Sequence, residues 1–305
     1  MGLPRLINRA GKAAVALETT LILHGVPRQN AVALAEALAN EVSSAGASPA
    51  LVGIVAGSPI VGINSQELAT LIDSPPHQVP KVNSANLGLV LAKAGSPDSP
   101  TYLGHGATTV STTLEIAHAA GVRTFATGGL GGVHPDLATH LDISGDLAAL
   151  ARIPLAVVTA GVKSILDVPA TREMLEALGV CVVGYRTNSF PAFYLRESSV
   201  GVDARFDDVA SLARFITMEL SRSGRAIVVA NPIPEDAAMD PEEFALLLVR
   251  AREEAVAQAI IGRATTPFLL GRLHSLSEGR TLEANIALAR SNARLAGEIA
   301  VLLEG

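Results

Sequence analysis

Short runs of valine, isoleucine, leucine and alanine recur along the chain, and each ends at glycine or a polar residue. Runs of this length and composition predict strands that are buried on both faces of a sheet. Longer stretches with a helical spacing of apolar residues lie between them. The alternation predicts an α/β fold with a largely parallel central sheet covered by helices. The predicted strands are residues 14–17, 51–56, 124–127, 155–159, 180–183 and 226–230, and the predicted helices are residues 30–45, 109–120, 164–166 continuing after a break into 171–178, 209–221, 241–260 and 281–303.

Two local features refine this picture. Residues 95–100 (GSPDSP) are the most linker-like part of the chain, but about six residues between predicted strands indicate a surface loop rather than a domain boundary. In the last predicted helix, Asn285 and Asn292 are seven residues apart. Two helical turns separate them, so both side chains are expected on one face.

The composition narrows the fold and the possible partners. Of the 305 residues 49% are hydrophobic, yet there is no Trp and there are only 3 Tyr and 7 Phe. A core of Ala, Val, Leu and Ile favours a helix-rich α/β chain over an antiparallel sandwich. The net charge of −6 provides no broad positive field, so we expect no nucleic-acid partner. A small phosphorylated ligand needs only a local group of donors and stays possible.

The N-terminal segment and the cysteine content indicate where the protein works. The first 25 residues contain apolar stretches that are too short and too interrupted for a membrane span, with neither a signal-peptide cleavage pattern nor a myristoylation motif. The single cysteine, Cys181, cannot form an internal disulfide. We therefore expect a soluble protein in a reducing cytoplasm, without a membrane partner.

Residues that follow predicted strands are candidates for catalysis, because reactive groups in parallel sheets gather where strands end. Glu18 ends one apolar strand, and Lys163 follows another after a small turn. At a sheet edge with a low dielectric constant, a lysine amine is expected to favour its neutral and nucleophilic form, because charge is poorly solvated there. Structural interpretations stay open, with Glu18 as a surface or capping residue and Lys163 as a phosphate-binding or solvent-facing side chain. Lys81 lies beside another apolar segment and suits a point charge on phosphate.

Two turns are rich in residues that bind ligands through the backbone. Residues 104–113 (GHGATTVSTT) open a predicted helix, so their N–H groups and hydroxyls predict either a phosphate site or plain helix capping. Residues 127–134 (TGGLGGVH) permit close approach of a ligand, but their glycine spacing differs from the dinucleotide-binding pattern. The chain has no GxxxxGK[ST] motif either. Dehydrogenase and nucleoside-triphosphate chemistry are therefore not favoured.

A pair of aspartates is a candidate for a metal site. Asp142 and Asp146 are four residues apart in the segment LDISGD, near a histidine. If Asp142 begins a helix, Asp146 lies one turn later on the same face, a spacing that suits a hard divalent cation held by oxygen ligands and water. The structural alternative is a capping Asp142 and a solvated Asp146.

Taken together and in this order, the segments resemble the pseudouridine-5'-phosphate glycosidase family, which includes proteins named for indigoidine synthesis. The resemblance extends from about residue 14 to residue 300. Several unusual motifs in one order are far more specific than any one of them. The motifs are ALETTLILHG, GATTVSTT, TFATGGLGGVH, DISGDL, TAGVKSILD, VVANPIPEDAAM, TTPFLL and LEANIALARSNARLAGEIA.

The resemblance implies a single α/β/α domain spanning residues 1–305, assembled as a homotrimer. It implies a manganese-assisted enzyme that cleaves pseudouridine 5'-phosphate reversibly to uracil and ribose 5-phosphate. Glu18 matches the proton donor, Lys163 the nucleophile and Asp142 the metal-associated carboxylate. The implied substrate-binding residues are Lys81, Thr109, Val110, Thr127, Gly128, His134, Ser144, Gly145, Asp146 and Asn285.

The chemistry of the implied reaction explains the need for a lysine. Uracil joined through carbon cannot leave with its bonding electrons on nitrogen, so the usual scheme with two carboxylates suits it poorly. In the expected mechanism Lys163 attacks C1' of the ribose while Glu18 delivers a proton and the sugar ring opens. The resulting imine is released by hydrolysis.

The chain departs from the family pattern at residues 26–30, at residues 83–86 and in the longer connection through residues 96–100. These departures lie beside the expected phosphate and base sites. The leading enzymatic alternative is therefore a relative that joins ribose 5-phosphate to another carbon nucleophile. The alternative from a different class is a non-catalytic sugar-phosphate binding protein, although binding alone would not require both Glu18 and Lys163.

Overall fold

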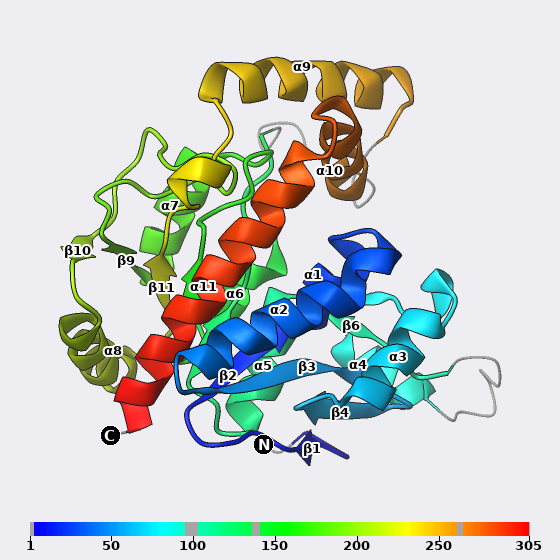
Figure 1. The fold of residues 1–305 in the computed structure, drawn as a ribbon, viewed down its shortest axis with the longest axis vertical. Helices are drawn as coiled ribbons and strands as arrows, with labels where there is room; N and C mark the ends of the chain where they lie inside the picture. The colour runs from blue at the N-terminus through cyan, green and yellow to red at the C-terminus, as the bar shows by residue number, and fades with distance from the viewer. Residues whose placement is uncertain (1–2, 95–102, 136–140, 261–264, 305) are drawn as a thin grey trace.

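The computed structural model describes residues 3–94, 103–135, 141–260 and 265–304. Within them, nine strands form one sheet in the order β1-β4-β3-β2-β7-β8-β11-β9-β10 (Figure 1). Neighbouring strands are parallel except β3 and β4, which are antiparallel. The strands are β1 (Ile7–Asn8), β2 (Ala14–Glu18), β3 (Ser48–Val55), β4 (Ser58–Val61), β7 (Thr124–Ala126), β8 (Ala156–Thr159), β9 (Cys181–Tyr185), β10 (Ala204–Phe206) and β11 (Ile227–Ala230), and β5 (Lys81–Val82) pairs with β6 (Ala107–Thr108) in a small separate parallel sheet.

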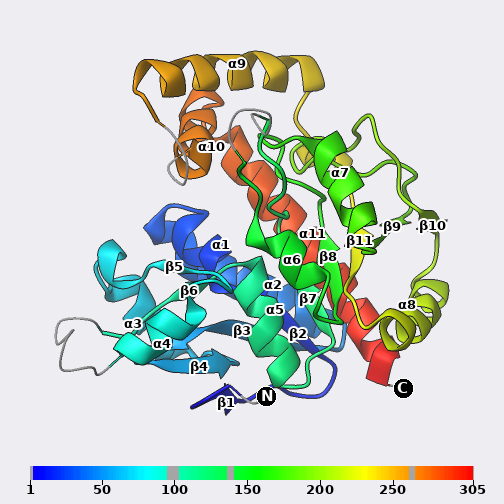
Figure 2. The ribbon, with the colours of Figure 1, turned by 180° about the vertical axis from the view of Figure 1, so that it is seen from behind.

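Helices cover both faces of the large sheet. Helices α2, α8 and α11 lie on one face (Figure 1), and α5, α6 and α7 lie on the other (Figure 2). This is the α/β/α arrangement with a largely parallel sheet that the sequence predicts. The helices are α1 (Thr19–His24), α2 (Ala31–Ser44), α3 (Ser65–Asp73), α4 (Leu87–Lys93), α5 (Val110–Ala119), α6 (Gly145–Leu150), α7 (Val168–Ala177), α8 (Val209–Ser223), α9 (Pro241–Ala257), α10 (Thr265–Leu276) and α11 (Arg280–Glu304).

The central strands are apolar because both of their faces are covered. All residues of β8 and β11 are buried, and so are the side chains of β7. The larger of two buried hydrophobic clusters among the described residues extends from Ala13 to Ala300 and joins the sheet to both helical layers. In the described part of the chain, no helix is long and apolar enough to cross a membrane.

The predicted elements agree with the structure in most places. All six predicted strands are present, and the predicted helices correspond to α2, α5, α7, α8, α9 and α11. The predicted start of the third helix at residues 164–166 is wrong, because this segment forms turns and α7 begins only at Val168. Asp167 caps α7 and Pro169 lies in its first turn, which sets that start. The proposed loop at residues 95–100 lies outside the described residues.

Candidate active site

Three neighbouring strands bring the predicted acid and the predicted nucleophile to one edge of the sheet. Glu18 is the last residue of β2, and Lys163 follows β8 after a short turn. Strand β7 lies between β2 and β8, and Thr127 comes directly after it. Because the three strands are parallel, their carboxyl ends meet at the same edge, where α/β sheets commonly bind ligands.

A cavity of about 300 Å³ opens at this edge. Much of its wall is apolar and comes from α1, α10, α11 and the aromatic pair Phe193 and Tyr194. A cavity of this size with a few polar groups suits a small ligand. The predicted site residues that line it are Glu18, Lys81, Gly128, Lys163 and Asn285.

Glu18 is a buried carboxyl group with a pKa near neutrality. Only 8% of the residue is exposed, and the Thr127 hydroxyl donates a hydrogen bond to its Oε1. Burial raises the pKa of Glu18 to about 7, although the positive charge of Lys163 and the Thr127 hydrogen bond both oppose this rise. A carboxyl group with a pKa near neutrality can hold and deliver a proton at physiological pH.

The backbone around Lys163 is fixed by two neighbouring segments. The Lys163 N–H donates to the Leu130 carbonyl over 3.2 Å, and the Phe193 N–H donates to the Ala160 carbonyl over 2.8 Å. Gly161 has a φ of +83°, and a β-carbon there would lie 1.8 Å from the carbonyl oxygen of Pro191. The turn before Lys163 therefore requires glycine both for its conformation and for space.

Lys81 and His24 supply nitrogen donors on another wall. Desolvation, together with the positive charge of Lys163, lowers the pKa of Lys81. The His24 ring bonds the Val79 carbonyl through Nε2 at 3.0 Å. Burial, followed by the charge of Lys81, lowers the pKa of His24, so its ring favours the neutral form.

Asp146 organises two of the predicted ligand-binding turns. Its Oδ1 accepts from the Ser111 N–H and its Oδ2 accepts from the Gly131 N–H, both over 3.0 Å. The first donor lies in the first turn of α5 and the second lies in the glycine-rich segment. Asp146 is 6% exposed and interacts electrostatically with Glu18. One side chain therefore holds both turns next to the cavity.

The expectation that Asp142 and Asp146 share a helix face is wrong. Helix α6 begins at Gly145, and the Ser144 hydroxyl caps it by accepting from the Asp146 N–H over 3.2 Å. Asp142 lies outside the helix, with 44% of its side chain exposed and its Oδ2 3.8 Å from Nε2 of His134. Because serine is the better-placed cap, the helix starts two residues later than an Asp142 cap would require.

The side chains near this segment that have metal-donor atoms close together are Asp142 and His134, which differ from the predicted aspartate pair. Across residues 3–94, 103–135, 141–260 and 265–304, no group of three or more His, Cys, Asp or Glu side chains could hold a metal ion. The His134 ring is 3.5 Å from the Thr266 hydroxyl, and Thr266 lines the cavity. The His134 imidazole thus lies next to a residue of the cavity wall, with the Asp142 carboxylate 3.8 Å from it, and a carboxylate is a donor type that suits divalent manganese.

The hydroxyl-rich turn is partly structural. Thr108 is fully buried, and its hydroxyl donates to the Val52 carbonyl over 2.8 Å. Thr109 occupies the N-cap position of α5, but its hydroxyl lies 3.2 Å from Oγ of Ser111 and caps no backbone N–H. Val110 is the first residue of α5. Plain side-chain capping by Thr109 is therefore not observed.

The aromatic pair Phe193 and Tyr194, which forms part of the cavity wall, was not among the residues predicted from the sequence. Phe193 has a φ of +60°, and its ring lies so close to Gly129 that a β-carbon there would be 2.5 Å from it. The ring of Phe193 is 4.5 Å from that of Tyr194, and both residues are buried. The one available signal was a pair of adjacent aromatics in a chain with 3% aromatic residues.

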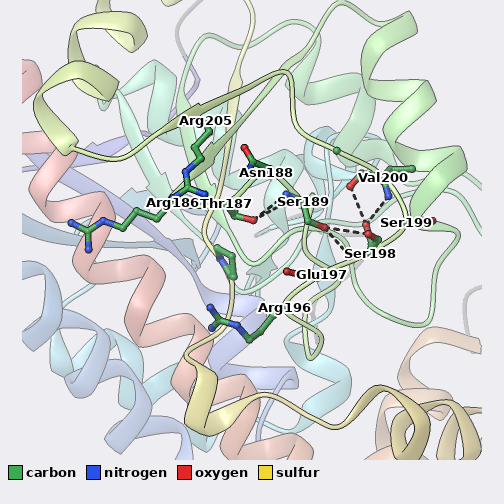
Figure 3. A pocket seen from close by; sticks show the side chains of 12 residues that line it. Arg186, Thr187, Asn188, Ser189, Arg196, Glu197, Ser198, Ser199, Val200 and Arg205 are labelled. Carbon is green, nitrogen blue, oxygen red and sulfur yellow. Dashed lines mark hydrogen bonds between the residues drawn. The ribbon is translucent and has the colours of Figure 1, made fainter.

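A second cavity of about 400 Å³ lies in the loop between β9 and β10 (Figure 3). Its polar side chains mainly hold that loop together. The Ser189 hydroxyl donates to the Ser198 carbonyl and accepts from the Ser198 N–H, and Arg186 and Arg205 both donate to Asp207. The cavity contains none of the predicted site residues.

Comparison with known proteins shows to which family the chain belongs. A sequence model described as indigoidine synthase A like protein matches residues 6–302. A pseudouridine-5'-phosphate glycosidase of Methylobacterium nodulans is 45% identical over 297 residues, which cover 97% of this chain and 85% of that protein. The glycosidase of Dinoroseobacter shibae is 42% identical and the match covers 95% and 92% of the two chains.

Two solved structures share the fold. An indigoidine synthase A-like protein of Thermotoga maritima superposes with a TM-score of 0.87 at 35% identity, covering 98% of this chain and 97% of that one. The prealnumycin C-glycosynthase AlnA, in complex with ribulose 5-phosphate, superposes with a TM-score of 0.85 at 34% identity, covering 95% and 91%. By sequence over nearly its whole length and by fold, the chain belongs to the indigoidine synthase A like protein family.

Proposed function

We propose that the protein cleaves the carbon–carbon glycosidic bond of pseudouridine 5'-phosphate reversibly, to uracil and ribose 5-phosphate, and that residues 1–305 act as one domain. The observation that carries this proposal is the meeting of Glu18 and Lys163 in one cavity at the ends of β2 and β8. The names of relatives that are 40–45% identical over 95–97% of the chain support it.

The first step uses the lysine as nucleophile and the carboxyl group as acid. The neutral amine of Lys163 forms a bond to C1' of the ribose while the bond from C1' to the ring oxygen breaks. Protonated Glu18 delivers its proton to that oxygen, and a pKa of about 7 keeps a substantial fraction of it protonated at neutral pH. The ring is then open, and the amine nitrogen carries an extra proton that the Glu18 carboxylate can accept.

The second step releases the base. The lone pair of the Lys163 nitrogen forms a double bond to C1', and the electron pair of the bond to uracil moves onto C5 of the base. Protonation at C5, with Glu18 as the donor, completes uracil. Water then adds to C1' of the imine, which restores the lysine and gives open-chain ribose 5-phosphate.

Binding of the substrate is distributed over residues of several elements. We propose that Lys81 acts as the positive charge on the phosphate, with Thr109, Val110, Ser144 and Gly145 on the adjoining turns. Asn285 lines the cavity next to Gly128, and within the described residues its Oδ1 is buried without a hydrogen-bond partner. An unpaired buried amide oxygen favours a ligand with a ring N–H, such as uracil.

We propose that Asp142 and His134 hold a divalent manganese ion together with water. Their donor types and their partial exposure fit a site in which solvent supplies the remaining ligands. When bound, the ion would help to orient the substrate and to stabilise developing negative charge.

We also propose that the chain assembles as a homotrimer. Helix α9 projects beyond the sheet layer (Figure 1), and its residues Leu246, Val249 and Val256 are 68%, 53% and 81% exposed. Their spacing places them on one side of the helix, and an exposed apolar stripe of this kind is typical of a subunit contact.

The experiment that tests the activity is an ultraviolet assay of uracil release from pseudouridine 5'-phosphate with manganese, with and without a chelator. Release that depends on the metal supports the proposal. A protein that forms a lysine imine with ribose 5-phosphate, reducible by borohydride, but neither releases nor incorporates uracil would favour the second candidate. That candidate joins ribose 5-phosphate to another carbon nucleophile, and the similarity to the C-glycosynthase AlnA supports it. Binding without imine formation would point to a sugar-phosphate binding protein.

A further inference from the structure

A buried chain of hydrogen bonds connects α11 to the carboxyl group of Glu18. Asn292, which is 0% exposed, donates from Nδ2 to the Thr127 carbonyl over 2.8 Å and to the Gly128 carbonyl over 3.4 Å. Thr127, which is 1% exposed, in turn donates from its hydroxyl to Oε1 of Glu18. The Asn292 amide is thus linked to Thr127, and Thr127 is linked to the Glu18 carboxyl group.

The orientation of the Asn292 amide is set by a second asparagine. Nδ2 of Asn231 donates to Oδ1 of Asn292 over 2.9 Å and to Oγ of Ser291 over 3.0 Å. Because Oδ1 already accepts this hydrogen bond, the donor side of the Asn292 amide must face Thr127. The Asn231 N–H donates to the Thr159 carbonyl over 2.9 Å, so the network is anchored to the end of β8.

Thr127 has little freedom within this network. Its N–H donates to the Val158 carbonyl over 3.0 Å, while its own carbonyl is held by Asn292. The peptide groups on both sides are therefore fixed, which leaves the hydroxyl aimed at Glu18. Thr127 is not among the residues that line the cavity, and its hydroxyl, carbonyl and N–H are all hydrogen-bonded within the protein.

We propose that Asn292 is a positioning residue for the proton donor, acting through Thr127 on the orientation and the ionisation of Glu18. The role in turnover rests on the proposed lysine–carboxyl mechanism, whereas the effect on Glu18 itself does not. The hydrogen bonds also attach α11 to the sheet, so the alternative is a purely structural function for Asn292.

A positioning role and a purely structural role of Asn292 predict different effects of its substitution on the ionisation of Glu18. The groups that act on its charge are Lys163 and Lys81, which favour the carboxylate, and Asp146, which disfavours it. The Thr127 hydrogen bond also favours the carboxylate, in opposition to burial. Loss of a correctly aimed hydroxyl removes that stabilisation, so Glu18 would keep its proton to higher pH. A structural residue alone would leave the ionisation of Glu18 unchanged.

The test compares Asn292→Leu with Ser291→Ala in the full-length protein. Leucine has a similar volume and removes both polar atoms, while Asn231 keeps Ser291 as an acceptor. Ser291→Ala disturbs the same network on the side that does not touch Thr127. Infrared difference spectra against Glu18→Gln follow ionisation of the carboxyl group across pH, and thermal unfolding measures the structural effect of each substitution.

We expect Asn292→Leu to shift Glu18 titration to higher pH and to lower kcat roughly 10- to 100-fold with little change in KM. Thr127→Val should give the same shift, Thr127→Ser should retain the normal titration, and Ser291→Ala should leave it unmoved. Substitution of both Asn292 and Thr127 should shift the titration no further than either alone. Normal titration of Glu18 in a folded Asn292→Leu protein would overturn the proposal. If the unsubstituted enzyme released no uracil, the proposed function would fail, but the infrared comparison would still decide this inference.

Discussion

Asp146 and Gly131 are joined by a hydrogen bond of 3.0 Å from the glycine N–H to a carboxylate oxygen, across a turn that admits no larger residue than glycine. A β-carbon on Gly131 would lie 2.3 Å from Oγ of Ser144 and 2.8 Å from the carboxylate. The second oxygen of Asp146 holds the Ser111 N–H at the start of α5. The start of α5 and the glycine-rich segment therefore depend on one buried side chain for their relative placement.

Replacement of Asp146 by alanine should destabilise the protein. It leaves two buried backbone N–H groups without an acceptor, and each costs about 1–3 kcal/mol. We expect the free energy of unfolding to fall by roughly 2–5 kcal/mol in chemical denaturation. Asp142→Ala is the matched control, because the side chain of Asp142 is 44% exposed, and its effect should stay within about 0.5 kcal/mol. Equal losses for the two variants would contradict this account of Asp146.

Replacement of Lys163 by alanine should abolish covalent trapping of ribose 5-phosphate by borohydride, because the amine that forms the imine is gone. Mass spectrometry of the reduced protein checks this directly. Lys81→Ala should raise the substrate concentration needed for trapping but leave the labelled residue unchanged, and the exposed Lys12 serves as a neutral control. A label that persists in Lys163→Ala would identify a different nucleophile.

The ionisation of Glu18 should make stability depend on pH. Its pKa is raised from 4.5 to about 7 in the folded state, so between these values the folded protein holds a proton that the unfolded chain has lost. Stability contributed by this group is therefore full below pH 4.5 and falls as pH rises to about 7, by about 3 kcal/mol. Denaturation at several pH values should show this fall, and Glu18→Gln should remove it. The same substitution should lower kcat by roughly 10²- to 10⁴-fold through loss of the acid.

Gly161→Ala should be far more damaging than substitution of another glycine with a positive φ. Gly161 has a φ of +83° and a neighbouring carbonyl oxygen 1.8 Å from the position of a β-carbon. Gly224 has a φ of +63°, but no atom lies within 4 Å of that position. We expect about 1–2 kcal/mol for Gly224→Ala and more than about 3 kcal/mol for Gly161→Ala, with loss of imine formation in the latter. Comparable stability of the two variants would show that the 161–163 turn can adapt.

Substitution of Asp142 should weaken the response to manganese. Removing one of two donors is expected to raise the manganese concentration for half-maximal activity by roughly tenfold or more. Fluorescence-detected titration of the ion, without substrate, provides a reading that does not require turnover. Asp236→Ala, which alters an exposed carboxylate in the 3-10 helix Glu235–Ala237, is the control. An unchanged manganese affinity in Asp142→Ala would place the ion elsewhere.

The sequence alone was enough to predict the class of fold and to single out Glu18 and Lys163, the two residues on which the proposed chemistry depends. Strands buried on both faces must be apolar throughout, so β2, β7, β8 and β11 were visible as short aliphatic runs. Glu18 and Lys163 were visible because each follows such a run, and the order of the surrounding motifs indicated the family. Helix α11 was long enough for its period to place Asn285 and Asn292 on one face, and both are buried.

The hydrogen-bond partners of the polar residues became visible only in the folded chain, because a polar group can bind either a ligand or another part of the protein, and only its neighbours in space distinguish the two. Asp146 resembled a metal ligand in sequence, but the fold brings Ser111 and Gly131 to it across 35 and 15 residues. Ser144, rather than Asp142, is the N-cap of α6, because its hydroxyl accepts from the Asp146 N–H in the folded chain. Phe193 reaches the cavity only because Gly129 leaves room for its ring. These contacts join residues that are far apart in the sequence, so local sequence patterns and propensities cannot predict them.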